Sequence, residues 1–274
     1  MTNTPPAERV AVSAISTFAL DLAGDLEFWS RHGIDLVGVS VAKLERFGWR
    51  DGTNRIADAI ADGLRVCDLI GLSPFDLAHP ERWEQQRERV VQSIECAATL
   101  AVPLIVFTTG PFAPLRWTEA ADAFEAALAP VLAEARRRNI AFAIEHTNSL
   151  RVDVGFVHTL RDALDLADRL DVGVCLEMNA CWAERDLDDT IRRGVDRVSL
   201  VQVSDFKVGT IASSQRLVPG DGDIPLRRLL ETLLAAGYRG VFELELIGDA
   251  IKQEGYDAAV PRAIAALRAL LRPT

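Results

Sequence analysis

Three glutamates and one glutamine each stand at or near the end of a short run with the length of a β-strand. Glu145 closes the run AFAIE, Glu177 closes VGVCLE, and Gln202 closes VSLVQ. Glu245 ends an alternation of apolar and acidic residues, FELE, which places Glu243 on the same face of the strand. A carboxylate at the end of a buried strand is costly unless it is paired or binds a cation. The four ends therefore predict one metal site.

Three carboxylates and an amide oxygen form an all-oxygen ligand set. Such a set suits Mg²⁺ or Mn²⁺, whereas zinc usually takes nitrogen or sulfur ligands. One such ion would polarise a carbonyl, stabilise an enediolate and lower the cost of removing the adjacent proton. Glu145 and Glu245 would flank the substrate and exchange protons with carbon, as isomerisation or epimerisation requires. The competing interpretation is that Glu145, Glu177 and Glu245 form buried ion pairs with arginines.

Strand-like and helix-like segments alternate along the whole chain of 274 residues. The sequence predicts strands over 10–17, 34–41, 64–72, 103–109, 140–145, 172–177, 198–204 and 241–246. Between and after them it predicts helices over 21–32, 54–63, 80–100, 118–139, 157–170, 187–194, 225–236 and 257–271. Eight strand–helix units at about 30-residue spacing predict an α/β barrel of parallel strands wrapped by helices, whose chemistry lies at the carboxyl ends of the strands. We find no linker and no change of composition, so we expect a single domain over 1–274.

Composition excludes several classes of partner. The net charge of −10 opposes binding to nucleic acid, and no apolar run approaches the roughly 20 residues of a membrane span. Residues 1–8 lack a signal sequence and are expected to be a disordered lead. The four cysteines show no CxxC spacing, which is typical of reduced core thiols in a cytoplasmic protein.

Several motifs occur together in the second half of the chain. They are AIEH at Glu145, LEMNACW at Glu177, VQVSD at Gln202, RLVPGDGDI from Arg216, and GYRG shortly before Glu245. On these motifs the chain resembles the xylose isomerase-like TIM barrel superfamily, which includes sugar isomerases and epimerases, inosose dehydratase and hydroxypyruvate isomerase. The resemblance covers essentially the whole chain. It implies a (β/α)8 TIM barrel and one divalent metal ion held by the four oxygen-bearing residues.

Three positions depart from the superfamily pattern. Glu177 replaces an aspartate, and Gln202 replaces a histidine, as it also does in the hydroxypyruvate isomerase branch. Ala180 stands where many relatives carry a histidine that meets the substrate, so that proton-transfer role is in doubt here.

The resemblance and the local sequence also suggest substrate contacts. Arg216, in a glycine- and proline-rich loop over the barrel mouth, resembles a clamp on substrate oxygens. Trp182 would stack on a sugar face or cover the rim, and Asp205 would orient Gln202 or Arg216 or cap a turn. His146 is a further candidate for substrate contact, although alternation points it away from Glu145.

Glu243 faces the barrel interior one layer below Glu245. A deep carboxylate without a partner would be too costly, so it is a candidate partner for an arginine.

The sequence thus predicts a metal-dependent isomerase or epimerase acting on a sugar-like or hydroxy-keto small molecule. A metal-dependent lyase that dehydrates a polyhydroxy ketone, inosose- or dehydroshikimate-like, begins with the same proton removal and stays open. A barrel without catalysis that acts as a binding subunit also stays open because of Ala180. The apurinic endonuclease branch, which uses three zinc ions and many histidines, is opposed by the four histidines and the acidic charge. The resemblance further implies a homo-oligomer.

Overall fold

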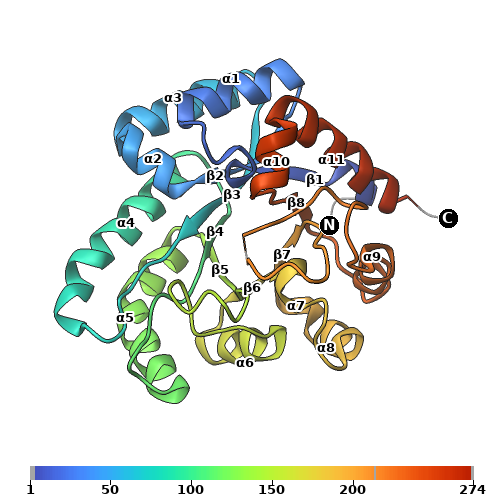
Figure 1. The fold of residues 1–274 in the computed structure, drawn as a ribbon. Coiled ribbons are helices and arrows are strands. Elements are labelled where there is room, and N and C mark those ends of the chain that lie inside the picture. The colour runs from blue at the N-terminus through green and yellow to red at the C-terminus, as the bar shows by residue number, and fades with distance from the viewer. Residues whose placement is uncertain (1–3, 213, 273–274) are drawn as a thin grey trace.

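Eight parallel strands close into a barrel in the computed structural model, which describes residues 4–212 and 214–272 (Figure 1). Each strand pairs with the next in sequence, and β8 closes the barrel by pairing with β1. The predicted α/β barrel is therefore confirmed. The strands are β1 (Val10–Ser13), β2 (Leu36–Ser40), β3 (Arg65–Leu72), β4 (Leu104–Phe107), β5 (Ala141–Glu145), β6 (Gly173–Glu177), β7 (Val198–Val203) and β8 (Val241–Leu244).

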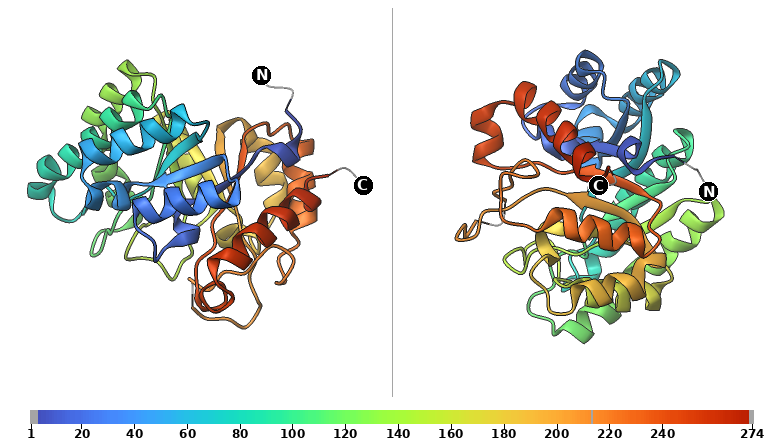
Figure 2. Two further views of the ribbon diagram at one scale, coloured as in Figure 1. Left: turned by 90° about the horizontal axis from the view of Figure 1, so that it is seen from above. Right: turned by 90° about the vertical axis from the view of Figure 1, so that its right-hand side faces the viewer.

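Helices surround the barrel, and the described N-terminal segment lies close to the last helix (Figures 1 and 2). None of the helices within the described residues is long and apolar enough to cross a bilayer. The α-helices are α1 (Leu22–His32), α2 (Val41–Phe47), α3 (Trp49–Ala61), α4 (Trp83–Thr99), α5 (Trp117–Arg137), α6 (Leu160–Leu170), α7 (Met178–Cys181), α8 (Leu187–Gly194), α9 (Leu226–Ala235), α10 (Asp249–Glu254) and α11 (Tyr256–Leu270). Short 3-10 helices are η1 (Pro6–Glu8), η2 (Ala14–Thr17), η3 (Pro80–Arg82) and η4 (Val195–Arg197).

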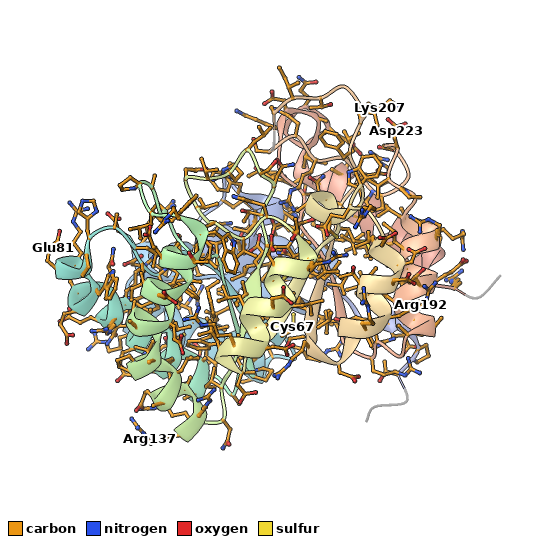
Figure 3. The ribbon with its side chains drawn as sticks, turned by 90° about the horizontal axis from the view of Figure 1, so that it is seen from below. Cys67, Glu81, Arg137, Arg192, Lys207 and Asp223 are labelled. Atoms are coloured by element: carbon orange, nitrogen blue, oxygen red, sulfur yellow. The ribbon has the colours of Figure 1, made fainter. Side chains whose placement is uncertain are left out.

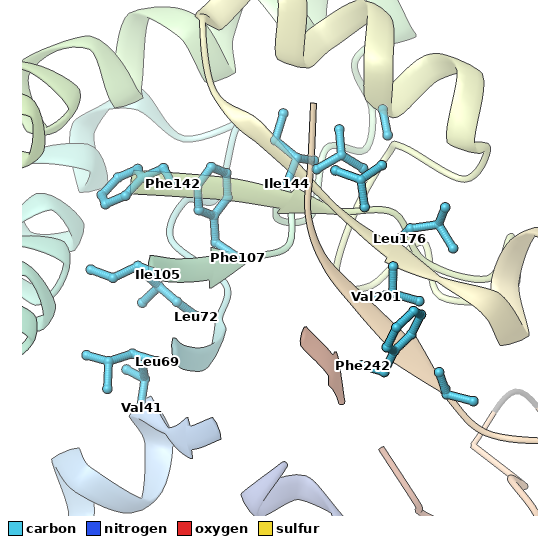
Figure 4. Close-up of a cluster of buried hydrophobic side chains, with 14 of the residues drawn as sticks. Val41, Leu69, Leu72, Ile105, Phe107, Phe142, Ile144, Leu176, Val201 and Phe242 are labelled. Carbon is cyan, nitrogen blue, oxygen red and sulfur yellow. The ribbon is translucent and has the colours of Figure 1, made fainter. Parts of the chain in front are cut away.

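The strands are buried on both faces, which explains why their sequences are almost continuously apolar. One set of side chains points outward and packs under the helices; Figure 4 shows part of it, including Phe107, Phe142 and Phe242. The other set fills the barrel and forms a separate small cluster of Ile70, Leu104, Val106, Ala143, Cys175 and Leu200. Alternation along β5 to β8 therefore places every second residue inside the barrel, including the acidic residues near the strand ends.

Several predicted strands are longer than the observed ones, and two of these differences affect residues at the barrel mouth. The strand predicted over 10–17 ends at Ser13, whose hydroxyl accepts a hydrogen bond from the Ile15 amide at 3.2 Å and starts η2. The strand predicted over 241–246 ends at Leu244, so Glu245 lies just beyond the sheet. Ile15 and Glu245 therefore lie in the turns that follow the strands, not in the strands themselves.

The helix prediction missed three short helices. Residues 41–47 were predicted as a strand end and a polar loop, but they form α2, because the Ser40 hydroxyl caps its first turn at the Lys43 amide. Helices α7 and α10 were also missed, and both are short. Pro6–Glu8 forms η1 within the segment expected to be disordered, and residues 1–3 of that segment lie outside the described part.

A buried ion pair fixes the turn after β1. The Lys43 ammonium contacts both oxygens of the fully buried Asp25, at 2.8 and 2.9 Å, and donates to the Ala14 and Thr17 carbonyls of η2. Burial nevertheless raises the pKa of Asp25 to about 6, with Lys43 and Thr17 opposing the shift. The pair links α1, α2 and η2, and η2 contributes Ile15 to the wall of the barrel mouth.

Replacing Lys43 with methionine should destabilise the protein by about 3–5 kcal/mol, because Asp25 would remain buried without a cation. Replacing both partners, as Asp25→Leu with Lys43→Met, should recover part of that loss. The measurement is urea unfolding at pH 7.5. The matched control is Arg65→Met, which breaks the exposed pair with Asp35 and should cost less than about 1 kcal/mol. Equal losses for Lys43→Met and the control would contradict the prediction.

Candidate metal and substrate site

Three carboxylates meet at the carboxyl ends of the strands. Glu145 ends β5, Glu177 ends β6, and Glu245 follows β8. One oxygen of each lies within 4.8 Å of the others, a spacing at which one ion can contact all three. Glu177 and Glu245 are only 2% and 6% exposed, and Glu145 is partly buried. The structure therefore brings together the three glutamates that the sequence singled out.

Arg216 is the cation that the structure places among these carboxylates. Its Nη1 lies 2.5 Å from Glu177 Oε2 and 3.0 Å from Glu245 Oε1. The competing interpretation, buried pairing with arginine, is thus correct for two of the three glutamates. Three carboxylates and one guanidinium leave two negative charges when all are ionised, which matches one divalent ion.

Burial controls the protonation of the cluster. It raises the pKa of Glu177 to about 7, with Arg216 opposing and Glu245 reinforcing the shift. Burial and the charges of Glu245 and Glu177 raise the pKa of Glu145 well above its usual value. Burial alone would lower the pKa of Arg216, but the glutamates outweigh it and keep the guanidinium charged. Without a further cation, burial therefore favours the protonated forms of Glu145 and Glu177.

Gln202 lies beside this cluster and is fully buried. It is in register with Glu177 on one side and Glu243 on the other, and its Nε2 donates to Glu245 Oε2. Its Oε1 has no hydrogen-bond partner among the described residues. An unused buried oxygen beside three carboxylates is consistent with the fourth ligand predicted from the sequence, which remains a prediction.

Asp205 anchors the loop that carries Arg216. Its Oδ1 accepts from the Phe206 and Ile224 amides at 2.8 and 3.1 Å, and its Oδ2 accepts from Gly220 at 2.8 Å. Gly222 passes so close to Asp205 that a side chain there would overlap the carboxylate. Asp205 does not line the cavity, so its effect on Arg216 acts through the loop.

His146 and Trp182 also lie outside the cavity lining. His146 is fully buried, and its Nε2 accepts from the Glu177 amide at 3.2 Å. Burial, with the charge of His158 adding to it, lowers the pKa of His146 to about 3, so it stays neutral. Trp182 is partly buried against the core. Their contacts with a substrate stay predictions, since neither side chain lines this cavity. In the structure His146 supports the backbone of Glu177.

A cavity of about 250 Å³ opens above the carboxylates. Its lining includes the three glutamates, Arg216 and Ala180, and all five were singled out from the sequence. Several polar lining residues escaped the sequence analysis: Ser73, Thr108, Asn148, Arg151, Asn179 and Ser214. Most follow a strand end by one to a few residues, which is the signal that would have revealed them.

The profile of the xylose isomerase-like TIM barrel family matches residues 26–270. The chain belongs to that family. The resemblance stated from the sequence motifs is therefore confirmed. No curated protein sequence matches the chain.

Solved structures share the barrel of this family. A protein from Sinorhizobium meliloti 1021 superposes with a TM-score of 0.82 at 22% identity, covering 96% of this chain and 98% of that one. The IolI protein, described with a bound zinc atom, gives 0.81 at 16%, covering 96% and 98%. The 3-keto-D-glucoside 4-epimerase of E. coli gives 0.74 at 17%, covering 95% and 99%. At these identities the likeness establishes the fold.

Replacing Arg216 with methionine should destabilise the protein without added metal by about 3–5 kcal/mol at pH 8, because Glu177 and Glu245 lose their cation. The pKa of Glu177 in the folded protein is about 7, above the ordinary 4.5, so its ionised form costs stability as pH rises through 7. The loss should therefore be smaller at pH 6, where Glu177 is protonated.

Urea unfolding in EDTA at both pH values measures this difference. The matched control is Arg192→Met, which breaks an exposed pair with Asp189 away from the cavity. The control should cost less than about 1 kcal/mol. A loss for Arg216→Met that does not depend on pH would show that the carboxylates are not the source of the effect.

Proposed function

We propose that this protein is a divalent-metal-dependent isomerase or epimerase acting on a sugar-like or hydroxy-keto substrate. The observation that carries the proposal is the meeting of Glu145, Glu177 and Glu245 in one cavity, where Arg216 pairs with only two of them. The epimerases among its structural neighbours support the same reaction class. The cavity volume suits a small molecule.

The residues present fit a divalent ion. Glu145, Glu177 and Glu245 would hold it, and Gln202 Oε1, which lacks a partner, would be the fourth ligand. Hard oxygen ligands favour Mn²⁺ or Mg²⁺. When bound, the ion would polarise the substrate carbonyl and make the adjacent proton more acidic.

The chain supplies the proton transfers. Glu145 and Glu245 come from different sides of the cavity, so one would remove the proton next to the carbonyl and the other would return a proton to carbon. Arg216, held by Glu177 and Glu245, would donate to a substrate oxygen through the nitrogens that remain free. Because Asp205 already holds the loop, Arg216 would stay in place, and the loop would not have to become ordered when the substrate binds.

A dehydratase shares the first proton removal, and Ala180, which lines the cavity, keeps a non-catalytic binding role open. Incubating the Mn²⁺-loaded protein with a panel of keto-sugars in D₂O distinguishes these functions. Isomerisation or epimerisation gives an isomer with deuterium at carbon, and dehydration gives a product lighter by one water. Binding without exchange would indicate the non-catalytic barrel. Light scattering in the same buffer tests whether the protein is a homo-oligomer.

Replacing Glu145 or Glu245 with glutamine keeps an oxygen near the ion but removes the base. Turnover should fall on the order of 10²–10⁴-fold in each variant, while Mn²⁺ affinity should fall less. Steady-state kinetics and titration calorimetry measure the two effects. Turnover that is unchanged in both variants would reject the assigned roles.

Gln202→Leu should weaken Mn²⁺ binding, because the site would lose its fourth oxygen. Gln202→His should still bind metal, shift toward zinc, and lose affinity near pH 6 as the imidazole takes up a proton. Titration calorimetry between pH 5 and 8 checks both variants. If Gln202→Leu binds Mn²⁺ as tightly as the parent, Gln202 is not a ligand.

A further inference from the structure

Two carboxylates that the mouth cluster does not use lie deeper in the barrel. Asp68 on β3 and Glu243 on β8 are both fully buried. Together with Cys67 (labelled in Figure 3) they offer ligand atoms within 4.8 Å of one another. Both carboxylates reach toward Gly38 on β2, where a side chain would overlap them. Glycine at position 38 therefore leaves the space in which the two groups approach each other.

An independent observation is that these oxygens lack partners. Neither oxygen of Glu243, and not Oδ1 of Asp68, makes a hydrogen bond of ordinary geometry within 4–212 and 214–272. The Gln202 side chain lies close enough to Glu243 to oppose the rise of its pKa that burial causes. The Cys67 thiol lies 3.1 Å from Asp68 Oδ2 and 3.2 Å from the Val37 carbonyl, so it serves as a donor. The arginine expected from the sequence beside Glu243 is not found: no ion pair in the described part of the chain involves Glu243 or Asp68.

The chain treats its other buried carboxylates differently. Asp25 is neutralised by Lys43, and Glu177 and Glu245 share Arg216, with a side-chain cation within 3.0 Å in each place. The buried Asp205 has no such cation but accepts hydrogen bonds from three backbone amides. Buried carboxylates without a cation are strongly unfavourable when ionised. At Asp68 and Glu243 the described residues provide neither a cation nor a set of backbone amides, although the two groups together would carry two negative charges.

We propose that a divalent cation binds between Asp68 and Glu243 inside the barrel, as a second site distinct from the one at the mouth. Two carboxylates balance one divalent charge, and oxygens within 4.8 Å of each other can both lie 2.0–2.6 Å from one ion. Mn²⁺ suits this buried place better than Mg²⁺, which tends to retain several waters.

The second site lies directly beneath the first. Glu243 precedes Glu245 by two residues on the same face, which corresponds to about 6–7 Å along the strand. Gln202 connects the two levels, because it is in register with Glu243 and bonded to Glu245. An interior cation would hold Glu243 in place. It would thereby stabilise the positions of Gln202 and Glu245 in the level above.

The test is to count metal ions in the full-length protein dialysed against Mn²⁺ and then against metal-free buffer. The interior variant is Asp68→Asn with Glu243→Gln, which keeps shape and removes charge. The mouth variant is Glu145→Leu with Glu177→Leu, which leaves Glu245 paired with Arg216. Elemental analysis should give about two Mn²⁺ per chain for the parent and about one for each variant.

Other numbers of bound Mn²⁺ would distinguish the interior site from the mouth site. One Mn²⁺ in both the parent and the mouth variant would support the interior site and reject the metal-dependent function proposed for the mouth. One in the parent and none in the mouth variant would overturn the interior site, and a proton shared by Asp68 and Glu243 would replace it. Two in the interior variant would also overturn it.

Anomalous scattering from Mn²⁺-grown crystals of the unaltered protein provides a second readout if the interior variant does not fold. A peak between Asp68 and Glu243 is expected. A peak at the mouth alone would overturn the proposal.

Discussion

Negative charge gathered inside a ring of parallel strands has to be neutralised where water is excluded, and this requirement governs the barrel mouth. Glu177 and Glu245 are nearly fully buried, and Arg216 contacts both. One guanidinium does not balance three carboxylates, and burial accordingly raises the pKa of Glu177 and Glu145. Protonation of these carboxylates, or the binding of a cation, would relieve this unfavourable charge.

The rest of the mouth holds these charges in position. Ser16 donates to the Leu244 carbonyl at 2.9 Å and accepts from the Leu246 amide at 3.0 Å, so its hydroxyl clamps the backbone on both sides of Glu245. His146 accepts from the Glu177 amide, and the Asn179 amide donates to Glu177 Oε1 at 2.8 Å. Glu177 and Glu245 are thus each held by hydrogen bonds with neutral groups as well as by the ion pair with Arg216.

The sequence allowed the barrel and the three glutamates to be predicted, because strand alternation and strand ends are local properties. It also predicted that His146 points away from Glu145, but not that its ring accepts a hydrogen bond from the Glu177 amide. For Asp205 it left turn capping and the orientation of a side chain both open, and contacts with backbone amides distant in sequence decide between them. Asn148 and Arg151 were missed because they lie beyond the end of β5, outside the strand-end positions. The helix α2 was missed because a single hydroxyl, on Ser40, decides where that segment becomes helical.

The loop between β7 and α9 is tied at both ends before any ligand arrives. Asp205 holds three of its amides, and the Lys207 ammonium and the Val208 amide both bind Asp223, at 2.8 and 2.9 Å (Figure 3). These anchored positions have already lost their conformational entropy during folding, so a ligand that contacts Arg216 does not have to order them again. The affinity of a ligand at this mouth is therefore not reduced by the ordering of these positions, and it depends on contacts with groups that are already in place.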